Sequence, residues 1–402
     1  MGISKARGDF PTMRKGRGVY LDSACQSLRP DSVIRAMTEY YEEYPGCGGR
    51  SVHEMSARVS LETDETREKL ASFFGTKDPN CCIFTKNTTE SINTVAFGLG
   101  LKKGDAVVTT DTEHNSNHVP WLVLAESVGI ERRYSVSGAD GEFDIESFKS
   151  RMDSGVKLVS VHHASNVTGC VLPVKDITEI AHDSGSKVLI DGSQAAPHMK
   201  VDLGRIGADF YAVSMHKMLG PAGMGVMYGS QEALEELRPL TFGGGTVGLA
   251  TYGRADMAPI PERFESGLQN YSGIVGAKAA VEYLEKIGMD NVAAQDRKLM
   301  RRMAAGVSGV RGLKIVGPED PDRRVGAFSF NIDGLGSHDV AMMLDRIDKI
   351  MIRSGMHCAH PFYESRGIEG SARASVYLYN DDGDVDRFAK ALAKVAETFG
   401  NH

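Results

Sequence analysis

The feature that most constrains the fold of this 402-residue chain is an alternation of strand-like and helix-like segments that starts near residue 80. Amphipathic stretches such as "TESINTVAFGLGL" separate short β-rich runs. This alternation predicts an α/β fold in which helices cover both faces of a mainly parallel sheet. Seven strand candidates fit the pattern: "CCIFTK", "DAVVTT", "RRYSV", "VKLVSVHHAS", "KVLIDGS", "ADFYAVS" and "GMGVMYG".

The pattern of strand-like and helical runs changes after the long helical stretch "GIVGAKAAVEYLEKIGM". This change indicates a second structural unit. Strand-like runs such as "VGAFSFNIDG" and "ARASVYLY" then mix with helical runs such as "DVDRFAKALAKVAETF". A chain of this length also favours two domains over one core. We therefore expect a large domain at residues 21–285 and a smaller α/β domain at residues 286–402, which the N-terminal segment 1–20 joins.

Charge and composition exclude several classes of protein. The net charge is −7 with a pI near 6.0, and no basic stripe suggests a nucleic-acid surface. The N-terminal stretch lacks an apolar core of signal-peptide length, and no later run approaches a membrane span, so we expect a cytoplasmic protein without membrane contact. The six cysteines are sparse and do not have the spacing of a disulfide framework.

Polar residues follow two strands of the expected sheet, where ligands of parallel sheets usually bind. Asp191 ends "VLID" and Gln194 follows three residues later, although an aspartate here could equally cap the next helix. Ser214, His216 and Lys217 follow "FYAVS" and precede a glycine-rich turn. A lysine in mostly apolar surroundings has a lowered pKa and is suited to Schiff-base chemistry.

The stretch "TKNTTES" predicts the start of a helix. Asn87 is the expected N-cap, Glu90 stands at the capping-box position, and Thr88 and Thr89 lie between them. A helix N-terminus with hydroxyls can bind phosphate, although a well-capped helix alone would explain the pattern. A lysine, a carboxylate and a phosphate site together are what pyridoxal 5'-phosphate requires.

Two other stretches contain residues with more than one interpretation. In "EHNSNHVPW", His114 could stack on a cofactor ring; with His118 it has metal-binding spacing, but no third ligand is evident. In "MHCAH", Cys358 lies between His357 and His360 and could be a metal ligand, half of a disulfide or a nucleophile. Sparse cysteines argue against the disulfide, and structural zinc would need four ligands.

The chain resembles a known protein family over nearly its whole length. The resemblance rests on "YLDSACQSLRP", "GRSVHEMSARVS", "TKNTTESIN", "TEHNSNHVPW", "SNVTG", "IDGSQAAPH", "SMHKMLGPAGMGVMYG", "RFESGLQN", "IRSGMHCAHP" and "RASVYLYN". It is similar to class V aminotransferase-fold enzymes, and among them to SufS-type cysteine desulfurases, including selenocysteine lyase-like members. The resemblance implies pyridoxal phosphate as cofactor, no metal, and the aspartate aminotransferase-like fold type I, with a seven-stranded sheet in the large domain.

The resemblance also implies a role for each matching residue. Lys217 would form the Schiff base and move the Cα proton, and Asp191 would pair with the ring nitrogen. Gln194 would contact the ring hydroxyl, and His114 would stack on the ring and serve as an acid or base. The family pattern assigns the phosphate to Thr89, Ser214 and His216, with Thr88 nearby in the cofactor site. Asn166 would contact both the cofactor and the substrate carboxylate, and Arg353 and Arg373 would also bind that carboxylate.

By the same resemblance Cys358 is the nucleophile, 15 residues before Arg373. It would take sulfur from L-cysteine as a persulfide and leave alanine, and His357 or a neighbouring cation could assist by lowering the thiol pKa. A protein acceptor would then use the sulfur for iron-sulfur clusters or other sulfur compounds.

The match departs from the family in two places and leaves other reactions open. Asn87 replaces the usual glycine, and Leu268 replaces a threonine that reaches the phosphate of the partner subunit in the homodimer that the family implies. A selenocysteine or cystine C–S lyase would not need Cys358. Another class V aminotransferase would release a keto acid.

Overall fold

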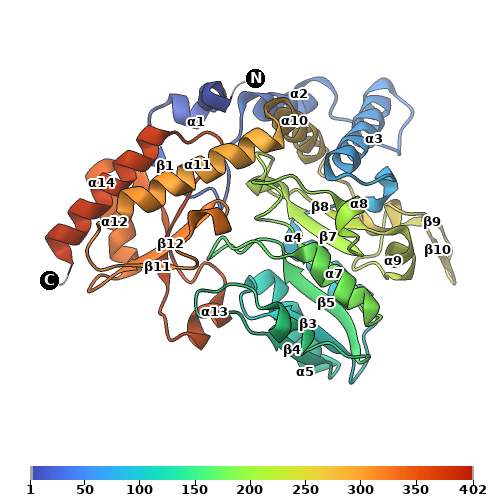
Figure 1. Cartoon of the computed structure of the whole chain (residues 1–402). Helices are drawn as coiled ribbons and strands as arrows, with labels where there is room; N and C mark the ends of the chain where they lie inside the picture. Colours follow the sequence, from blue (N-terminus) through green and yellow to red (C-terminus); the bar gives the residue numbers. More distant parts are fainter. Residues whose placement is uncertain (1–2, 401–402) are drawn as a thin grey trace.

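The computed structural model describes residues 3–400 and contains a large sheet of seven strands (Figure 1). The strand order is β2-β8-β7-β6-β5-β3-β4. Only β8 runs antiparallel to its neighbours, so the predicted mainly parallel sheet is confirmed. The strands are β2 (Cys82–Thr85), β3 (Ala106–Thr110), β4 (Glu131–Ser135), β5 (Val156–His162), β6 (Lys187–Asp191), β7 (Phe210–Ser214) and β8 (Gly225–Gly229).

Both faces of this sheet are buried, because successive strand residues point to opposite faces. Val107 of β3 packs in a core with α4 and α5, whereas its neighbours Ala106 and Val108 pack in the core of the other face. The first core is closed by α4 (Thr88–Gly98), α5 (Val119–Ser127) and α9 (Gln231–Glu236). The second is closed by α2 (Asp31–Glu43), α3 (Glu54–Phe74), α7 (Val174–Asp183) and α10 (Tyr271–Ile287).

The C-terminal part forms a second, antiparallel sheet in the order β11-β12-β15-β14. Its core contains Leu299, Phe330 and Phe388. The strands are β11 (Leu313–Val316), β12 (Ala327–Ile332), β14 (Arg353–Gly355) and β15 (Ser371–Ser375), and the helices are α11 (Met289–Val307), α12 (Ser337–Asp348) and α14 (Asp382–Phe399). Figure 1 shows these orange and red elements beside the green sheet.

The two sheets fall on either side of the predicted boundary at residue 286, and the boundary itself stays a prediction. The N-terminal segment contacts both cores: Phe10 packs in the larger one, while Val19 of β1 (Val19–Tyr20) pairs with β13 (Ile350–Met351) in the smaller one. Residues 1, 2, 401 and 402 of the predicted small domain lie outside the described residues. Within residues 3–400, no helix combines the length and apolar character needed to cross a bilayer.

A buried ion pair ties α3 to the edge of the large sheet. Both terminal nitrogens of Arg67 donate to Glu265, at 2.8 and 2.9 Å. Glu265 also accepts a hydrogen bond from the backbone N–H of Phe84 in β2. Both side chains are buried, so the loss of one charge leaves the other without compensation.

We expect Arg67→Met to lower the free energy of unfolding by about 3–5 kcal/mol. The double variant Arg67→Met with Glu265→Gln should lose less, because the amide still accepts from Phe84 and carries no buried charge. Urea unfolding followed by the fluorescence of Trp121, the single tryptophan, reports on this sheet. An equal or larger loss in the double variant would contradict this account.

Candidate active site

A cavity of about 230 Å³ lies where the carboxyl ends of the large sheet's strands face the small sheet. Since parallel strands end at one edge, residues far apart in sequence converge there. Cys358 is the only predicted site residue that does not line this cavity. Those that line it are Thr88, Thr89, His114, Asn166, Asp191, Gln194, Ser214, His216, Lys217, Arg353 and Arg373.

Lys217 ends the short 3₁₀ helix η4 (Met215–Lys217), directly after β7. Burial lowers the pKa of its amine; Asp191 opposes this shift, while the charge of Arg373 adds to it. The positive form is therefore disfavoured in the cavity. A lysine in this state can act as a nucleophile and as a base.

Asp191 and Gln194 are fixed on the cavity wall by the turn that follows β6. Asp191 Oδ1 accepts a hydrogen bond from Ser193 N at 2.9 Å, and Gln194 Nε2 donates to Ala24 O at 2.8 Å. Both side chains are buried. The wall thus presents a carboxylate whose position is set by the backbone.

A group of hydroxyls surrounds the first turn of α4. The backbone N–H of Thr88 donates to Ser214 Oγ at 2.9 Å, and Thr88 Oγ1 lies 2.7 Å from Ser193 Oγ. Asn87 caps the helix by accepting from Glu90 N at 3.0 Å, as the sequence predicted. Hydroxyls and free N–H groups at a helix start are suited to bind a phosphate.

His114 stays neutral at the cavity wall. Burial, followed by the charges of Lys217, Arg353 and Arg373, lowers its pKa to about 3. Its Nδ1 accepts from the backbone N–H of Ser116 at 3.1 Å, so the proton of the neutral ring lies on Nε2. His118, which shares the metal-like spacing, packs on Tyr134 instead, and no metal-type cluster of three acidic, histidine or cysteine side chains occurs within residues 3–400.

Two arginines from the small sheet face the cavity. Arg353 of β14 and Arg373 of β15 stand opposite each other in register. Arg373 is completely buried; it donates to Asn166 O at 2.8 Å and to Asp22 Oδ1 at 3.5 Å, while its Nε has no partner. Like charges directly opposite each other are unfavourable, so this pair fits an anionic ligand such as a carboxylate. The amide of Asn166 itself donates to His357 O at 2.7 Å.

Cys358 lies next to the cavity and is connected to it by Arg353. Arg353 Nη2 is 3.4 Å from Cys358 Sγ, while Arg353 itself lines the cavity. His357 and Cys358 both have left-handed backbones, with φ of 49° and 58°, which non-glycine residues adopt only at a cost. The backbone N–H of Asn115 donates to Cys358 O at 2.6 Å, which holds the loop in this shape.

Of the two proposed activators of the thiol, the structure favours the cation. Burial, with the charges of Arg373 and Arg353, lowers the pKa of His357 to about 2, so this ring carries no charge. Its Nε2 lies 3.0 Å from Ser371 Oγ. The positive group beside the thiol is therefore Arg353.

Several cavity residues were not singled out from the sequence. Ser193 could have been found, because it lies between Asp191 and Gln194 in "DGSQ". Cys25 and His162 line the cavity, but neither stands in a pattern that indicates it. Leu268, the noted departure, is 65% exposed and lies outside the cavity.

The arrangement fits pyridoxal phosphate. It offers Lys217 with a lowered pKa for the aldehyde, the fixed carboxylate of Asp191 for the ring nitrogen, and the hydroxyls at the start of α4 for the phosphate. The opposed pair of Arg353 and Arg373 is then available to bind the carboxylate of an amino acid.

Comparisons with known proteins agree with this site. The Aminotransferase class-V family model matches residues 19–388. A probable cysteine desulfurase of Halalkalibacterium halodurans is 39% identical, covering 95% of this chain and 94% of its own. A cysteine desulfurase of Haloferax volcanii is 36% identical over 99% of this chain and 97% of its own.

Solved structures are similar as well. The apo structure of a cysteine desulfurase from Thermococcus onnurineus NA1 has a TM-score of 0.94, 36% identity and 98% coverage of both chains. A cystine C–S lyase, C-DES, has a TM-score of 0.85 at 24% identity, with 98% of this chain and all of the lyase covered, and this likeness shows the fold alone. With the family model spanning almost the entire chain, the protein belongs to the class V aminotransferase family of pyridoxal phosphate enzymes, as the sequence predicted.

Proposed function

We propose that this chain is a cysteine desulfurase of the SufS type, which converts L-cysteine to L-alanine and keeps the sulfur as a persulfide on Cys358. The observation that carries the proposal is the position of Arg353, which lines the cavity and lies 3.4 Å from Cys358 Sγ. A guanidinium beside a thiol favours the thiolate, which is the nucleophilic form. The relatives named cysteine desulfurases support the same reaction.

Bound pyridoxal phosphate supplies an aldehyde for the substrate amino group and an electron sink for the charge that develops at Cα. Burial lowers the pKa of the Lys217 amine, so this lysine would hold the aldehyde of the cofactor and would take the Cα proton of the substrate. Asp191 would hold the ring nitrogen, and Gln194 and His114 would contact the ring. The phosphate would be held by Thr89, Ser214 and His216, with Thr88 nearby.

The transfer of sulfur takes place at the loop that carries Cys358. Arg353 and Arg373, with Asn166 beside them, bind the carboxylate of L-cysteine and fix the direction of its side chain. The Cys358 thiolate attacks the substrate sulfur; the new S–S bond forms as the Cβ–S bond breaks. The electrons of the broken bond remain on the carbon product, which takes up protons and leaves as alanine.

The persulfide requires an acceptor, and we propose that a protein removes this sulfur for iron-sulfur clusters or related products. A cytoplasmic location is consistent with the thiols, because all six cysteines are free in the structure. Cys358 is only partly exposed and its loop is held by Asn115. The acceptor therefore has to bring its own thiol to the loop.

Cys358→Ser should abolish alanine release from L-cysteine in the presence of reductant, by at least about 100-fold, because a hydroxyl is a far weaker nucleophile towards sulfur. Cys47→Ser is the matched control, since Cys47 is also partly exposed but does not line the cavity. Alanine dehydrogenase coupled to NADH formation measures the product.

Other outcomes would favour the alternatives. Equal alanine release, or pyruvate release, from wild type and Cys358→Ser would favour a C–S lyase, and a keto acid formed with amino transfer would favour an aminotransferase.

Arg353→Met should slow the alkylation of Cys358 by iodoacetamide at neutral pH by about tenfold, because the cation that stabilises the thiolate is lost. Arg353→Lys should retain part of the rate, since a charge remains without the planar guanidinium. Peptide mass spectrometry gives the rate at each cysteine. An unchanged rate at Cys358 in the methionine variant would remove Arg353 from its proposed role.

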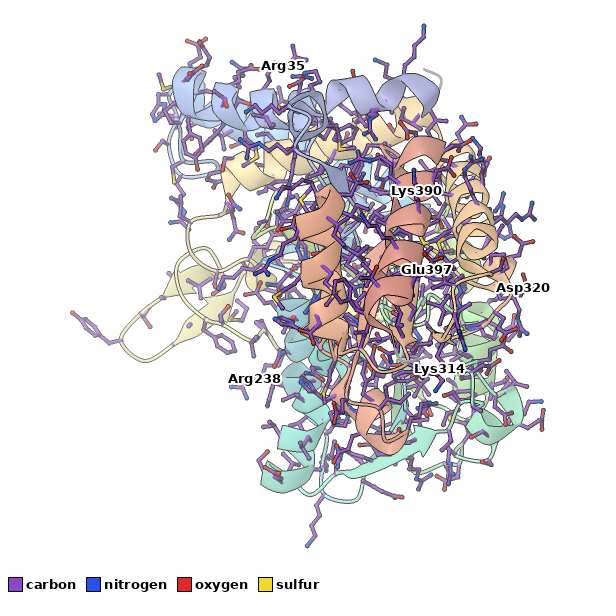
Figure 2. All side chains as sticks on the ribbon, turned by 90° about the vertical axis from the view of Figure 1, so that its left-hand side faces the viewer. Arg35, Arg238, Lys314, Asp320, Lys390 and Glu397 are labelled. Atoms are coloured by element: carbon purple, nitrogen blue, oxygen red, sulfur yellow. The ribbon has the colours of Figure 1, made fainter. Side chains whose placement is uncertain are left out.

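We also propose a homodimer, and an exposed hairpin supports it. The hairpin consists of β9 (Val247–Ala250) and β10 (Ala255–Met257), and Figure 2 shows it reaching out from the body of the molecule. Leu249, Tyr252 and Met257 on this arm are exposed. Projecting apolar side chains of this kind are typical of a surface that a second subunit covers.

The chain should therefore sediment at twice its mass of 43.5 kDa. Changing Leu249 and Tyr252 together to aspartate should shift the protein towards the monomer, because the charges could not be buried. Ile347→Asp is the matched control. Ile347 is also an exposed apolar residue, but it lies on α12, in the C-terminal part that contains the small sheet. Sedimentation of the wild type as a monomer at micromolar concentration would contradict the dimer.

A further inference from the structure

A buried histidine on the cavity wall has no place in the mechanism above. His162 is the last residue of β5 and is 4% exposed. Its Nδ1 donates to Glu113 Oε1 at 2.9 Å. Glu113, also buried, accepts further hydrogen bonds from Thr110 Oγ1, Asn117 Nδ2 and the backbone N–H of His162. A carboxylate with this many donors is stable as an anion inside the protein.

The surroundings of this pair favour the charged form of each group. Burial alone would raise the pKa of Glu113, but His162 and the hydrogen bonds from Thr110 and Asn117 lower it instead. Burial alone would lower the pKa of His162, but Glu113, helped by Asp191 and Asp111, raises it. The pair with Glu113 therefore favours the imidazolium form of the ring over the neutral form.

The adjacent histidine provides a contrast. His163 is equally buried, and its Nδ1 lies 2.9 Å from the hydroxyl of Tyr211. Burial, together with the charge of His162, lowers the pKa of His163 to about 4. The surroundings thus favour the charged form of His162 and the neutral form of His163, which makes His163 an internal control.

One ring nitrogen of His162 has no protein partner. His162 Nε2 is buried and has no hydrogen bond among the described residues, yet His162 lines the cavity. Parallel pairing places His162 of β5 in register with Asp191 of β6, and side chains in register point to the same face of a sheet. The imidazolium thus stands beside the carboxylate that is proposed to hold the cofactor's ring nitrogen.

We infer that His162 is a positioning residue for Asp191: its hydrogen bond to Glu113 holds the ring beside Asp191, where the positive form of the ring attracts the carboxylate that is proposed to retain the cofactor. This inference rests on the proposed use of pyridoxal phosphate. The charged groups that interact with His162 are Glu113, Asp191 and Asp111, which are all acidic. Removal of the imidazolium would leave Lys217 as the positive group that interacts with Asp191, while the acidic groups around residue 162 remain.

The test measures cofactor retention rather than turnover. The loaded full-length chain is dialysed at a series of falling pH values, and retained pyridoxal phosphate is measured after release in alkali. His162→Asn keeps a donor near Glu113 but removes the charge. Since the positive charge beside Asp191 is lost in this variant, we expect its retention midpoint to rise by about one pH unit. His163→Asn, the matched control, should leave the midpoint unchanged.

Circular dichroism at each pH restricts the comparison to folded protein. If His162→Asn does not fold because Glu113 is left unpaired, the double variant Glu113→Gln with His162→Asn removes both buried charges and should show a smaller upward shift, because the negative charge of Glu113 is lost as well. A wild-type midpoint in either folded variant, or an equal shift in His163→Asn, would overturn the inference alone. A wild-type chain that retains no pyridoxal phosphate would overturn the proposed function as well.

Discussion

The completely buried guanidinium of Arg373 is the group around which the rest of the site is arranged. It joins the two sheets, because it belongs to β15 of the small sheet and donates to Asn166 O, beyond the end of β5 in the large sheet. Its charge contributes to the lowered pKa values of His114, Lys217 and His357. One buried cation therefore helps to disfavour the positive forms of the lysine and both histidines, which leaves the arginines as the positive groups that meet an anionic substrate.

The rigid support of Cys358 follows from the same meeting of the two sheets. Its loop is held from the large sheet by Asn115, and the next strand of the small sheet holds it through Ser371, which contacts both His357 and Tyr363. A thiol held in this way lies beside Arg353, which itself lines the cavity. The left-handed backbone at residues 357 and 358 is part of this placement, because an extended backbone would turn the side chain elsewhere.

Sequence patterns predicted those parts of the structure that depend on local order. Alternating hydrophobic runs located the strands of the large sheet, and residues at the strand ends, such as Asp191 and Lys217, proved to line one cavity. The capped start of α4 was also confirmed. The residue pattern left the role of Cys358 open, and only the family resemblance selected a nucleophile.

Contacts between distant segments could not be predicted in this way. The register that sets Arg353 opposite Arg373 depends on how two short strands pair, and the approach of Arg353 to Cys358 depends on two left-handed residues. The pair of Glu113 and His162 joins two strand ends that are 49 residues apart. Neither the antiparallel direction of β8 nor the cavity position of Cys25 has a local signal.

The measurement that tests the central claim most directly is the position of the sulfur after one turnover. The chain is mixed with L-cysteine without reductant, quenched, and its tryptic peptides are weighed. The account predicts one additional sulfur atom on the peptide of residues 354–366, which carries Cys358, in step with the alanine released. Alanine formed with the sulfur on the peptide that carries Cys25, or with no sulfur on the protein, would contradict it.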